Sequence, residues 1–204
     1  MSPVKERRAR EKRELRGKIL DAARDLFIRE GYENVSMRRV AEAIEYSPTT
    51  IYLYFENKFE LLFCLCEETF ALLVRELEAL HRECADPVVC LRQGLRAYVE
   101  FGLKSPNHYR VTFVSPPAHQ EESSKYLTPN SMGMRAFSFL STLVGEAVRQ
   151  GKFRRVDVAA TSQTLWAAVH GITSLLITHP DFPWAERDLL IDHLIDTMLS
   201  GLKM

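Results

Sequence analysis

Apolar residues recur every three to four positions along most of the chain, as they do on the buried faces of helices. Near the N-terminus, Ile19, Ala23 and Phe27 follow this spacing and predict a helix over about residues 12–30, which Gly31 ends. Further helices are expected over about residues 37–44, 48–55, 58–84, 87–103, 106–114, 131–150, 158–178 and 184–199. Because no segment shows the alternation of a strand, the pattern predicts an all-α fold.

Two helix starts lie eleven residues apart in the first third of the chain. Ser36 precedes the first, where its hydroxyl can accept from the unpaired backbone N–H groups of the opening turn. Ser47 followed by Pro48 precedes the second, as a cap and then the residue best suited to the first helical position. Only a short turn at Glu45 and Tyr46 separates the two helices. This pattern indicates a helix-turn-helix, whose second helix enters the DNA major groove.

The expected outer surface of the second helix carries small or hydroxylated side chains and no acid before Glu56. Hydroxyls, helix N-termini and cations suit phosphates, and threonine can also contact base edges. We therefore expect phosphate contacts from Ser36, Arg38, Tyr52, Tyr54 and Lys58, and base contacts from Ser47, Pro48, Thr49 and Thr50.

Two of these assignments carry alternatives. The ring of Tyr52 either packs into the three-helix core and offers only its hydroxyl to DNA, or lies on the surface, and Tyr54 is expected to be the fuller phosphate contact. Arg38 and Arg39 both follow the Ser36 cap; Arg38 is expected to face the DNA backbone and Arg39 to be solvated.

Residues 18–62 resemble the N-terminal domain of the TetR (tetracycline-repressor-like) family. The resemblance rests on two motifs, Tyr52-x-Tyr54-Phe55-x-x-Lys58 and, upstream, Ala22-Ala23-x-x-Leu26-Phe27-x-x-x-Gly31. It implies a homodimer with a helical ligand-binding body.

The chain departs from the family pattern at two places. Glu45 stands where the turn of the family has glycine, which predicts a left-handed backbone at a cost of roughly 1 kcal/mol. Pro48-Thr49 replaces the common Lys-Gly at the start of the recognition helix. No operator sequence can therefore be carried over from the family.

The 27 basic and 27 acidic residues of the 204-residue chain cancel, which alone argues against a nucleic-acid-binding protein. Their distribution changes this conclusion, because residues 1–18 carry eight Lys or Arg against three Glu, a net charge of about +5. The excess lies beside the predicted helix-turn-helix, where a phosphate-binding surface is needed. Residues 1–11 are expected to be a disordered basic arm, either a solvated tail or a contact with phosphates or the minor groove.

The four cysteines, at positions 64, 66, 84 and 90, are too few and too unevenly placed for a disulfide scaffold. Cys64 and Cys66 lie two positions apart on a predicted helix and point in different directions, so they cannot easily bridge. A reducing cytoplasm fits this usage best. No secretory signal is visible, and the most apolar run, residues 165–178, is too short to span a bilayer.

Aromatic and amphipathic side chains are frequent after residue 97, and small ligands are usually held in largely apolar pockets with a few polar groups. Trp166 and His170 are four residues apart and share a helix face. Residues 165–171 also resemble a C-terminal signature of one branch of TetR-like regulators, with Trp, His and Gly at these spacings. The expected ligand-binding residues are Tyr98, Phe101, Tyr109, Phe113, Phe137, Trp166 and His170. The alternative is that each aromatic is ordinary core and that His170 is a structural histidine.

The motifs divide the chain into an N-terminal DNA-binding domain, residues 1–57, and a C-terminal ligand-binding and dimerisation domain, residues 58–204. Small residues on the helix near 158–178 and surplus Leu, Ile and Met on the last helix predict a four-helix bundle with a second chain. The family resemblance implies the same pairing. The alternative is that both helices pack within one body.

The sequence therefore predicts a homodimeric repressor that a small, apolar ligand releases from a palindromic operator in double-stranded DNA. No zinc-ligand spacing, catalytic triad or Gly-rich phosphate loop is recognisable, so we predict no metal, no cofactor and no enzymatic activity. Two alternatives remain. One is a ligand-independent DNA-binding regulator or activator. The other is an enzyme or carrier whose helical body binds a small molecule while the N-terminal DNA-binding domain is vestigial.

Overall fold

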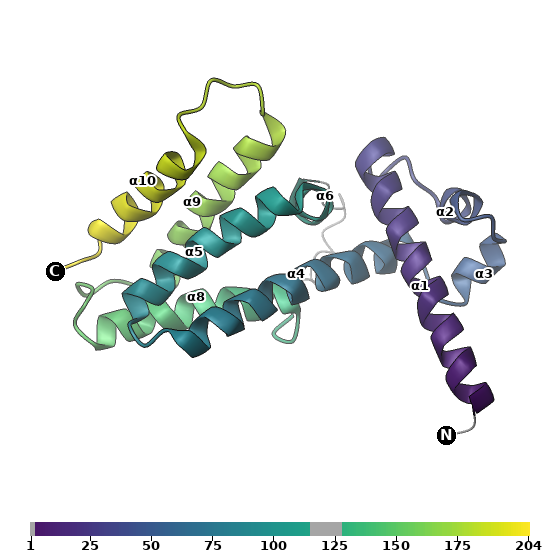
Figure 1. Cartoon of the computed structure of the whole chain (residues 1–204), viewed down its shortest axis with the longest axis horizontal. Helices are drawn as coiled ribbons and strands as arrows, with labels where there is room; N and C mark the ends of the chain where they lie inside the picture. Colours follow the sequence, from purple (N-terminus) through teal and green to yellow (C-terminus); the bar gives the residue numbers. More distant parts are fainter. Residues whose placement is uncertain (1–2, 115–127) are drawn as a thin grey trace. The chain divides into compact units, whose positions relative to one another are not determined.

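The computed structural model describes residues 3–114 and 128–204, and these residues confirm the all-α fold (Figure 1). Apart from an isolated bridge between Phe153 and Lys203, their regular elements are helices. The elements are α1 Pro3–Glu30, α2 Met37–Ala43, α3 Pro48–Tyr52, α4 Lys58–Glu83, α5 Pro87–Lys104, α6 Pro106–Tyr109, the π-helical turn η1 Arg110–Val114, α8 Met132–Arg149, α9 Val158–Thr178 and α10 Arg187–Ser200.

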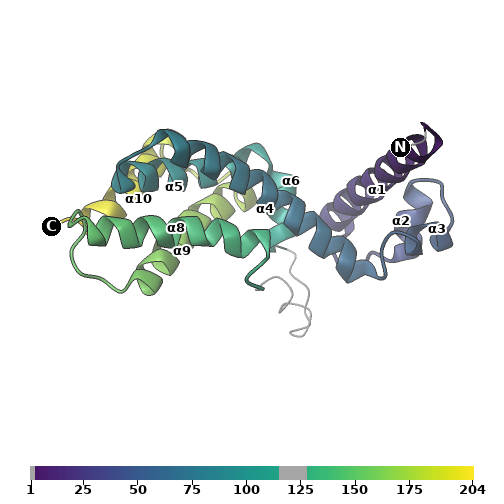
Figure 2. The same ribbon diagram turned by 90° about the horizontal axis from the view of Figure 1, so that it is seen from below.

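The described residues form two compact units. Unit 1 takes its residues from Met1–Thr69 and Asn107–Thr128, and unit 2 from Phe70–Pro106 and Pro129–Met204. The division falls within α4, whereas the sequence analysis placed a domain boundary at the start of this helix. In unit 2, α5 packs against α8, α9 and α10 (Figure 2).

The core of unit 1 forms where α1 meets the two short helices α2 and α3. Ile19, Ala23 and Phe27 of α1 are buried, as the apolar spacing predicted. Val40 of α2 and Ile51 of α3 are fully buried in the same cluster. Burial of these side chains removes apolar surface from water, which stabilises the pair of short helices against α1.

Both predicted serine caps are present. The Ser36 hydroxyl accepts from the backbone N–H of Arg39 at 3.1 Å, and the Ser47 hydroxyl accepts from that of Thr50 at 3.2 Å. Glu45, in the turn between α2 and α3, has a φ of 61°. The predicted left-handed backbone at a non-glycine residue is therefore confirmed, and so is the helix-turn-helix.

Helix α1 begins much earlier than predicted. It starts at Pro3 instead of near residue 12, so the expectation of a disordered arm over residues 1–11 is wrong for residues 3–11. Arg7 pairs with Glu11 at 3.4 Å and Arg10 with Glu14 at 3.7 Å, and such i,i+4 pairs support a helix. Of residues 115–130, which separate two of the expected helices, the structure describes only 128–130.

The turn between α4 and α5 is held by a disulfide that the sequence analysis did not anticipate. Cys84 and Cys90 are bonded, with 5.7 Å between their Cα atoms, whereas Cys64 and Cys66 are free thiols. Asp86, between the bonded pair, accepts from the N–H of Val88 at 2.8 Å and caps α5. The pairing escaped notice because it depends on where α4 stops and α5 starts.

Candidate functional site

Helix α3 buries one face and exposes the other. Ile51 lies in the core at 0% exposure, whereas Pro48 and Thr49 at the start of the helix are exposed. The hydroxyls of Ser47 and Thr50 lie 2.9 Å apart, so the Thr50 hydroxyl forms a hydrogen bond with the hydroxyl of the cap residue. Because the caps fix the start of the helix, Pro48 and Thr49 form its accessible N-terminal surface.

The two tyrosines of the motif lie in opposite environments. Tyr52 is 55% exposed, so the interpretation that packs its ring into the core is wrong. Tyr54 is half-buried and packs against the core cluster, with Nζ of Lys12 5.9 Å from its ring centroid. The helical turn continues past Tyr52, since the backbone N–H of Tyr54 donates to the carbonyl oxygen of Ile51 at 2.9 Å, and Tyr54 therefore lies one turn after the buried Ile51.

Lys58 has a structural role that the sequence analysis missed. Its ammonium donates to the carbonyl oxygens of Tyr32 at 2.7 Å and Glu33 at 3.4 Å. The same Nζ lies 4.2 Å from the centroid of the Tyr32 ring, a cation–π contact. Lys58 therefore ties the start of α4 to the segment after α1, and any phosphate contact would be made in addition.

The two arginines that follow the Ser36 cap are both exposed and both paired. Nε of Arg38 contacts Glu42 at 3.2 Å along α2. Arg39 reaches back to Glu30 of α1 at 3.0 Å, and this hydrogen bond raises the pKa of the Arg39 guanidinium. Arg39 is therefore anchored to α1 instead of being simply solvated.

Two exposed apolar side chains of unit 1 were missed by the sequence analysis. Leu53, the C-cap of α3, is 74% exposed, and Tyr46 in the turn before α3 is 43% exposed. The signal for Leu53 was present, because it lies between the two motif tyrosines. Both residues extend the accessible surface around α3.

Four of the seven predicted ligand-binding residues meet in unit 2. The indole Nε1–H of Trp166 donates to the hydroxyl oxygen of Tyr98 at 3.3 Å, and this oxygen lies 3.0 Å from Nδ1 of His170. The ring of Phe137 meets the ring of Trp166 edge-on, with 6.1 Å between the centroids. Helices α5, α8 and α9 thus bring one hydrogen-bonded chain and a set of aromatic faces together.

Burial lowers the pKa of His170, which favours the neutral imidazole. A neutral ring can accept a hydrogen bond from the Tyr98 hydroxyl at Nδ1 while the indole N–H of Trp166 donates to the oxygen of the same hydroxyl. The cluster therefore presents neutral polar groups beside aromatic rings.

Of the remaining three predicted ligand-binding residues, two lie in the other unit and one lies one turn after Tyr98 in α5. Tyr109 and Phe113 belong to unit 1, where their ring centroids lie 4.8 Å apart and Tyr109 is 1% exposed. Phe101 is 7% exposed in α5. The structure therefore divides the predicted set between the two units.

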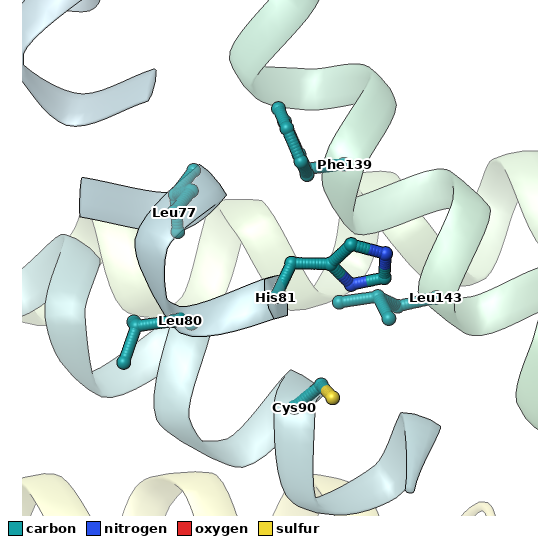
Figure 3. A pocket seen from close by; sticks show the side chains of 7 residues that line it. Leu77, Leu80, His81, Cys90, Phe139 and Leu143 are labelled. Atoms are coloured by element: carbon teal, nitrogen blue, oxygen red, sulfur yellow. The ribbon is translucent and has the colours of Figure 1, made fainter. Parts of the chain in front are cut away.

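A small apolar cavity lies elsewhere in unit 2, between α4, α5 and α8, and is large enough for about one water molecule (Figure 3). Its edge includes the imidazole of His81, whose ring centroid lies 6.2 Å from that of Phe139. The lining residues are Leu77, Leu80, His81, Cys90, Gly94, Phe139 and Leu143, none of which was predicted to bind a ligand.

Among residues 3–114 and 128–204, no three His, Cys, Asp or Glu side chains gather so that they could hold a metal ion. None of the helices in these ranges combines the length and the apolar character that spanning a bilayer requires.

Both halves of the chain match known families. Residues 19–64 match the family described as "Bacterial regulatory proteins, tetR family", and residues 91–199 match "Tetracyclin repressor-like, C-terminal domain". The first match contains α2, α3 and the serine caps. The second contains the cluster of Tyr98, Phe137, Trp166 and His170.

Two relatives and one solved structure illustrate the similarity. The probable HTH-type transcriptional regulator ArpR of Pseudomonas putida is 24% identical over 95% of this chain and 94% of its own length. The HTH-type transcriptional activator FasR of Mycolicibacterium smegmatis is 28% identical over 49% of this chain, and the match spans only 46% of FasR. The structure of the transcriptional regulator FadR from Bacillus subtilis in complex with stearoyl-CoA has a TM-score of 0.79 and 20% identity, covering 91% of this chain and 98% of FadR.

Proposed function

The chain belongs to the tetR family of bacterial regulatory proteins and is a DNA-binding transcriptional regulator, and we propose that it acts as a homodimeric repressor of a palindromic operator. A small, apolar ligand bound in unit 2 releases it from the DNA. The protein works in the cytoplasm, where the operator is accessible, and it has no enzymatic activity.

The exposed start of α3 is the observation that carries the DNA-binding role. Ser47 fixes the first turn, Ile51 holds the inner face, and Pro48, Thr49 and Tyr52 remain accessible. A helix held in this way can enter a major groove with its N-terminal residues against base edges. In the proposal, Thr49 and Pro48 contact bases together with the cap residues Ser47 and Thr50, while Ser36, Arg38, Tyr52, Tyr54 and Lys58 hold phosphates.

The last two helices support the homodimer. One face of α9 is buried, but Ala160 and Ala167 are exposed and Leu175 is 44% exposed on the same helix. On α10, Leu189 is 64% exposed although Ile191 is buried. A second copy of this pair of helices would cover these small and apolar side chains in a two-fold bundle. Two α3 helices would then reach two half-sites at least one DNA turn apart.

The chemistry of the cluster in unit 2 supports an apolar ligand with a polar group. Phe137 and Trp166 supply aromatic faces, and Tyr98 and His170 supply neutral hydrogen-bonding groups. A long acyl chain, as in the stearoyl-CoA bound to FadR, is one ligand of this kind. Phe101, in the same helix of unit 2 as Tyr98, is a further proposed contact for the ligand. Release requires that the ligand bind the DNA-free state more tightly, because equal affinity for both states shifts nothing.

An activator is the second candidate, and the relative FasR favours it because that protein is named an activator. An activator would use the same α3 surface and the same dimer, but its ligand would increase DNA binding or leave it unchanged. The sign of the ligand effect therefore separates the two candidates.

Selection from random DNA duplexes tests the DNA-binding role with the full chain at moderate salt. The proposal predicts enrichment of an inverted repeat. Fluorescence anisotropy of the selected duplex then tests the ligand role with stearoyl-CoA, stearate and CoA alone. Release by an acyl compound but not by CoA supports an apolar inducer, and tighter binding supports the activator. Failure to enrich any inverted repeat contradicts the proposed function.

A further inference from the structure

The N-terminal half of α1 carries a row of cations that no part of the proposed function uses. Lys5, Arg8 and Lys12 are exposed and follow one another at spacings of three and four residues. At 3.6 residues per turn they lie within about 60° of one another around the helix axis. Each cation therefore occupies the same helix face, one turn after the previous one.

This row continues the buried face of α1. Ile19 and Leu26, which pack into the core of unit 1, lie within about 40° of Lys12 around the helix axis. Arg16, between the core and the row, is engaged inside the unit, where it contacts Glu68 at 3.4 Å and Cys64 at 3.2 Å. On the N-terminal side of Arg16, the face of α1 that packs against the helix-turn-helix becomes cationic.

Two of the three acids of this segment lie away from the row. Glu6 and Glu14 are about 100° or more from each of its cations around the axis, whereas Glu11 is about 60° from Arg8. Two of them are engaged by other arginines, Glu11 by Arg7 and Glu14 by Arg10. The positive charge is therefore concentrated on the face that carries Lys5, Arg8 and Lys12.

The row adjoins the proposed DNA-reading surface. Nζ of Lys12 lies 5.9 Å from the ring centroid of Tyr54, two residues after the end of α3. Figure 1 shows the N-terminal end of α1, in dark purple, running past α2 and α3. From Lys5 to Lys12 the helix rises by about 10 Å, which is enough to follow several phosphates of a DNA strand.

We propose that Lys5, Arg8 and Lys12 form a second DNA contact, a phosphate track that holds the duplex flanking the half-site read by α3. The proposal rests on the proposed function, because the row gains this role only if α3 binds DNA. Its partner is the sugar-phosphate backbone of double-stranded DNA, which carries the complementary charge and is continuous with the site at α3. A membrane surface fits poorly, because the opposite face of this segment carries Glu6, Glu14 and Arg10 in place of apolar residues.

The track contributes affinity without sequence information. The logarithm of the DNA-binding constant falls linearly with the logarithm of the salt concentration, and each phosphate neutralised by a cation makes this slope steeper by about 0.9. Because the homodimer carries two such rows, the triple substitution Lys5→Ala, Arg8→Ala and Lys12→Ala should flatten this slope by about 5 units. It should weaken the selected inverted repeat and a scrambled duplex by the same factor.

The matched control removes the same number of cations from the other faces of α1. Arg7→Ala, Arg10→Ala and Arg13→Ala together also delete three cations from the same helical segment, and alanine preserves the helix in both variants. The control should leave the slope within about half a unit of the wild-type value. Circular dichroism checks that both triple variants keep the helix content of the wild type.

The experiment is an anisotropy titration of the full chain and both variants over a series of salt concentrations. A flatter slope for the row variant alone supports the track. Equal slopes for the two variants, or no change from the wild type, overturn it while the DNA-binding function stands. A wild-type chain that binds no inverted repeat overturns both proposals.

Discussion

The hydroxyl oxygen of Tyr98 lies 3.0 Å from Nδ1 of His170, and this contact joins α5 to α9 inside unit 2. The same oxygen accepts from the indole N–H of Trp166 at 3.3 Å. One phenol group thus satisfies two polar groups of α9, on residues that the sequence places four positions apart. Buried polar groups are costly to leave without partners, so this hydroxyl is a sensitive position.

Tyr98→Phe should lower the free energy of unfolding by about 1 kcal/mol, because it removes a hydrogen bond to the half-buried His170 and one to Trp166, which is 39% exposed, while keeping the ring. Tyr46→Phe is the matched control, since the same hydroxyl is removed from a side chain that is 43% exposed, and it should change stability by less than about 0.5 kcal/mol. Urea unfolding measures both. Equal effects would show that the Tyr98 hydroxyl does not hold α5 and α9 together.

The pH dependence of stability should report His170. Burial lowers its pKa in the folded chain below the ordinary 6.5, so the unfolded chain takes up the proton at a higher pH. The stability contributed by the neutral ring is therefore present above pH 6.5 and is lost as the pH falls below that value. His108 acts in the same direction, because burial, followed by the charge of Arg24, lowers its pKa too.

NMR titration of the histidine ring protons gives the measurement, with His170→Gln and His108→Gln assigning the two signals. His170→Gln should also reduce the fall in unfolding free energy between about pH 7.5 and pH 5.5. A folded-state pKa of His170 at or above 6.5 would contradict this account of its environment.

Glu45→Gly should stabilise the helix-turn-helix. The φ of 61° at Glu45 places a side chain in the left-handed region, and glycine adopts this conformation without the steric penalty, so a gain of about 0.5–1 kcal/mol is expected. Glu42→Gly, the same change within α2, should instead cost about 1 kcal/mol. Thermal unfolding compares the two, and a loss of stability with Glu45→Gly would show that its side chain stabilises the turn in another way.

Thr49→Ala should change which sequences are bound. Thr49 is exposed at the start of α3, and a lost base contact costs about 1–3 kcal/mol at that base pair alone. Binding of the selected repeat should fall while binding of a scrambled duplex is unchanged. Should both duplexes lose affinity equally, Thr49 reads no base.

Lys58→Ala should give the opposite pattern. Loss of one phosphate contact from each chain of the homodimer weakens binding to all duplexes and flattens the salt slope by about two units. Since the ammonium also holds the carbonyls of Tyr32 and Glu33, the free energy of unfolding should fall by about 1–3 kcal/mol as well. A fall in stability with an unchanged salt slope would leave Lys58 a structural role only.

The features that the sequence predicted correctly depend on local chemistry. Ser36 and Ser47 cap the helices that follow them, and Glu45 adopts the positive φ that its place in the turn requires. Each of these features is determined by residues within four positions in the chain. For the same reason, the bounds of most helices were predicted to within a few residues.

The features that escaped the sequence analysis depend on contacts or helix ends that a local pattern does not reveal. Lys58 binds carbonyls twenty-five and twenty-six residues earlier in the chain. Tyr54 packs against the core cluster of unit 1, a contact that the motif itself does not reveal. The start of α1 at Pro3 was missed because a charged segment without apolar spacing gives no periodic signal, although its ion pairs favour a helix.

The stoichiometry of the complex between the full chain and the selected inverted repeat tests the central claim most directly. Light scattering should give two chains per duplex, and a duplex that carries only one half-site should bind much more weakly. Two α3 helices of a homodimer predict this result. One chain per duplex, or equal affinity for the single half-site, would contradict the account.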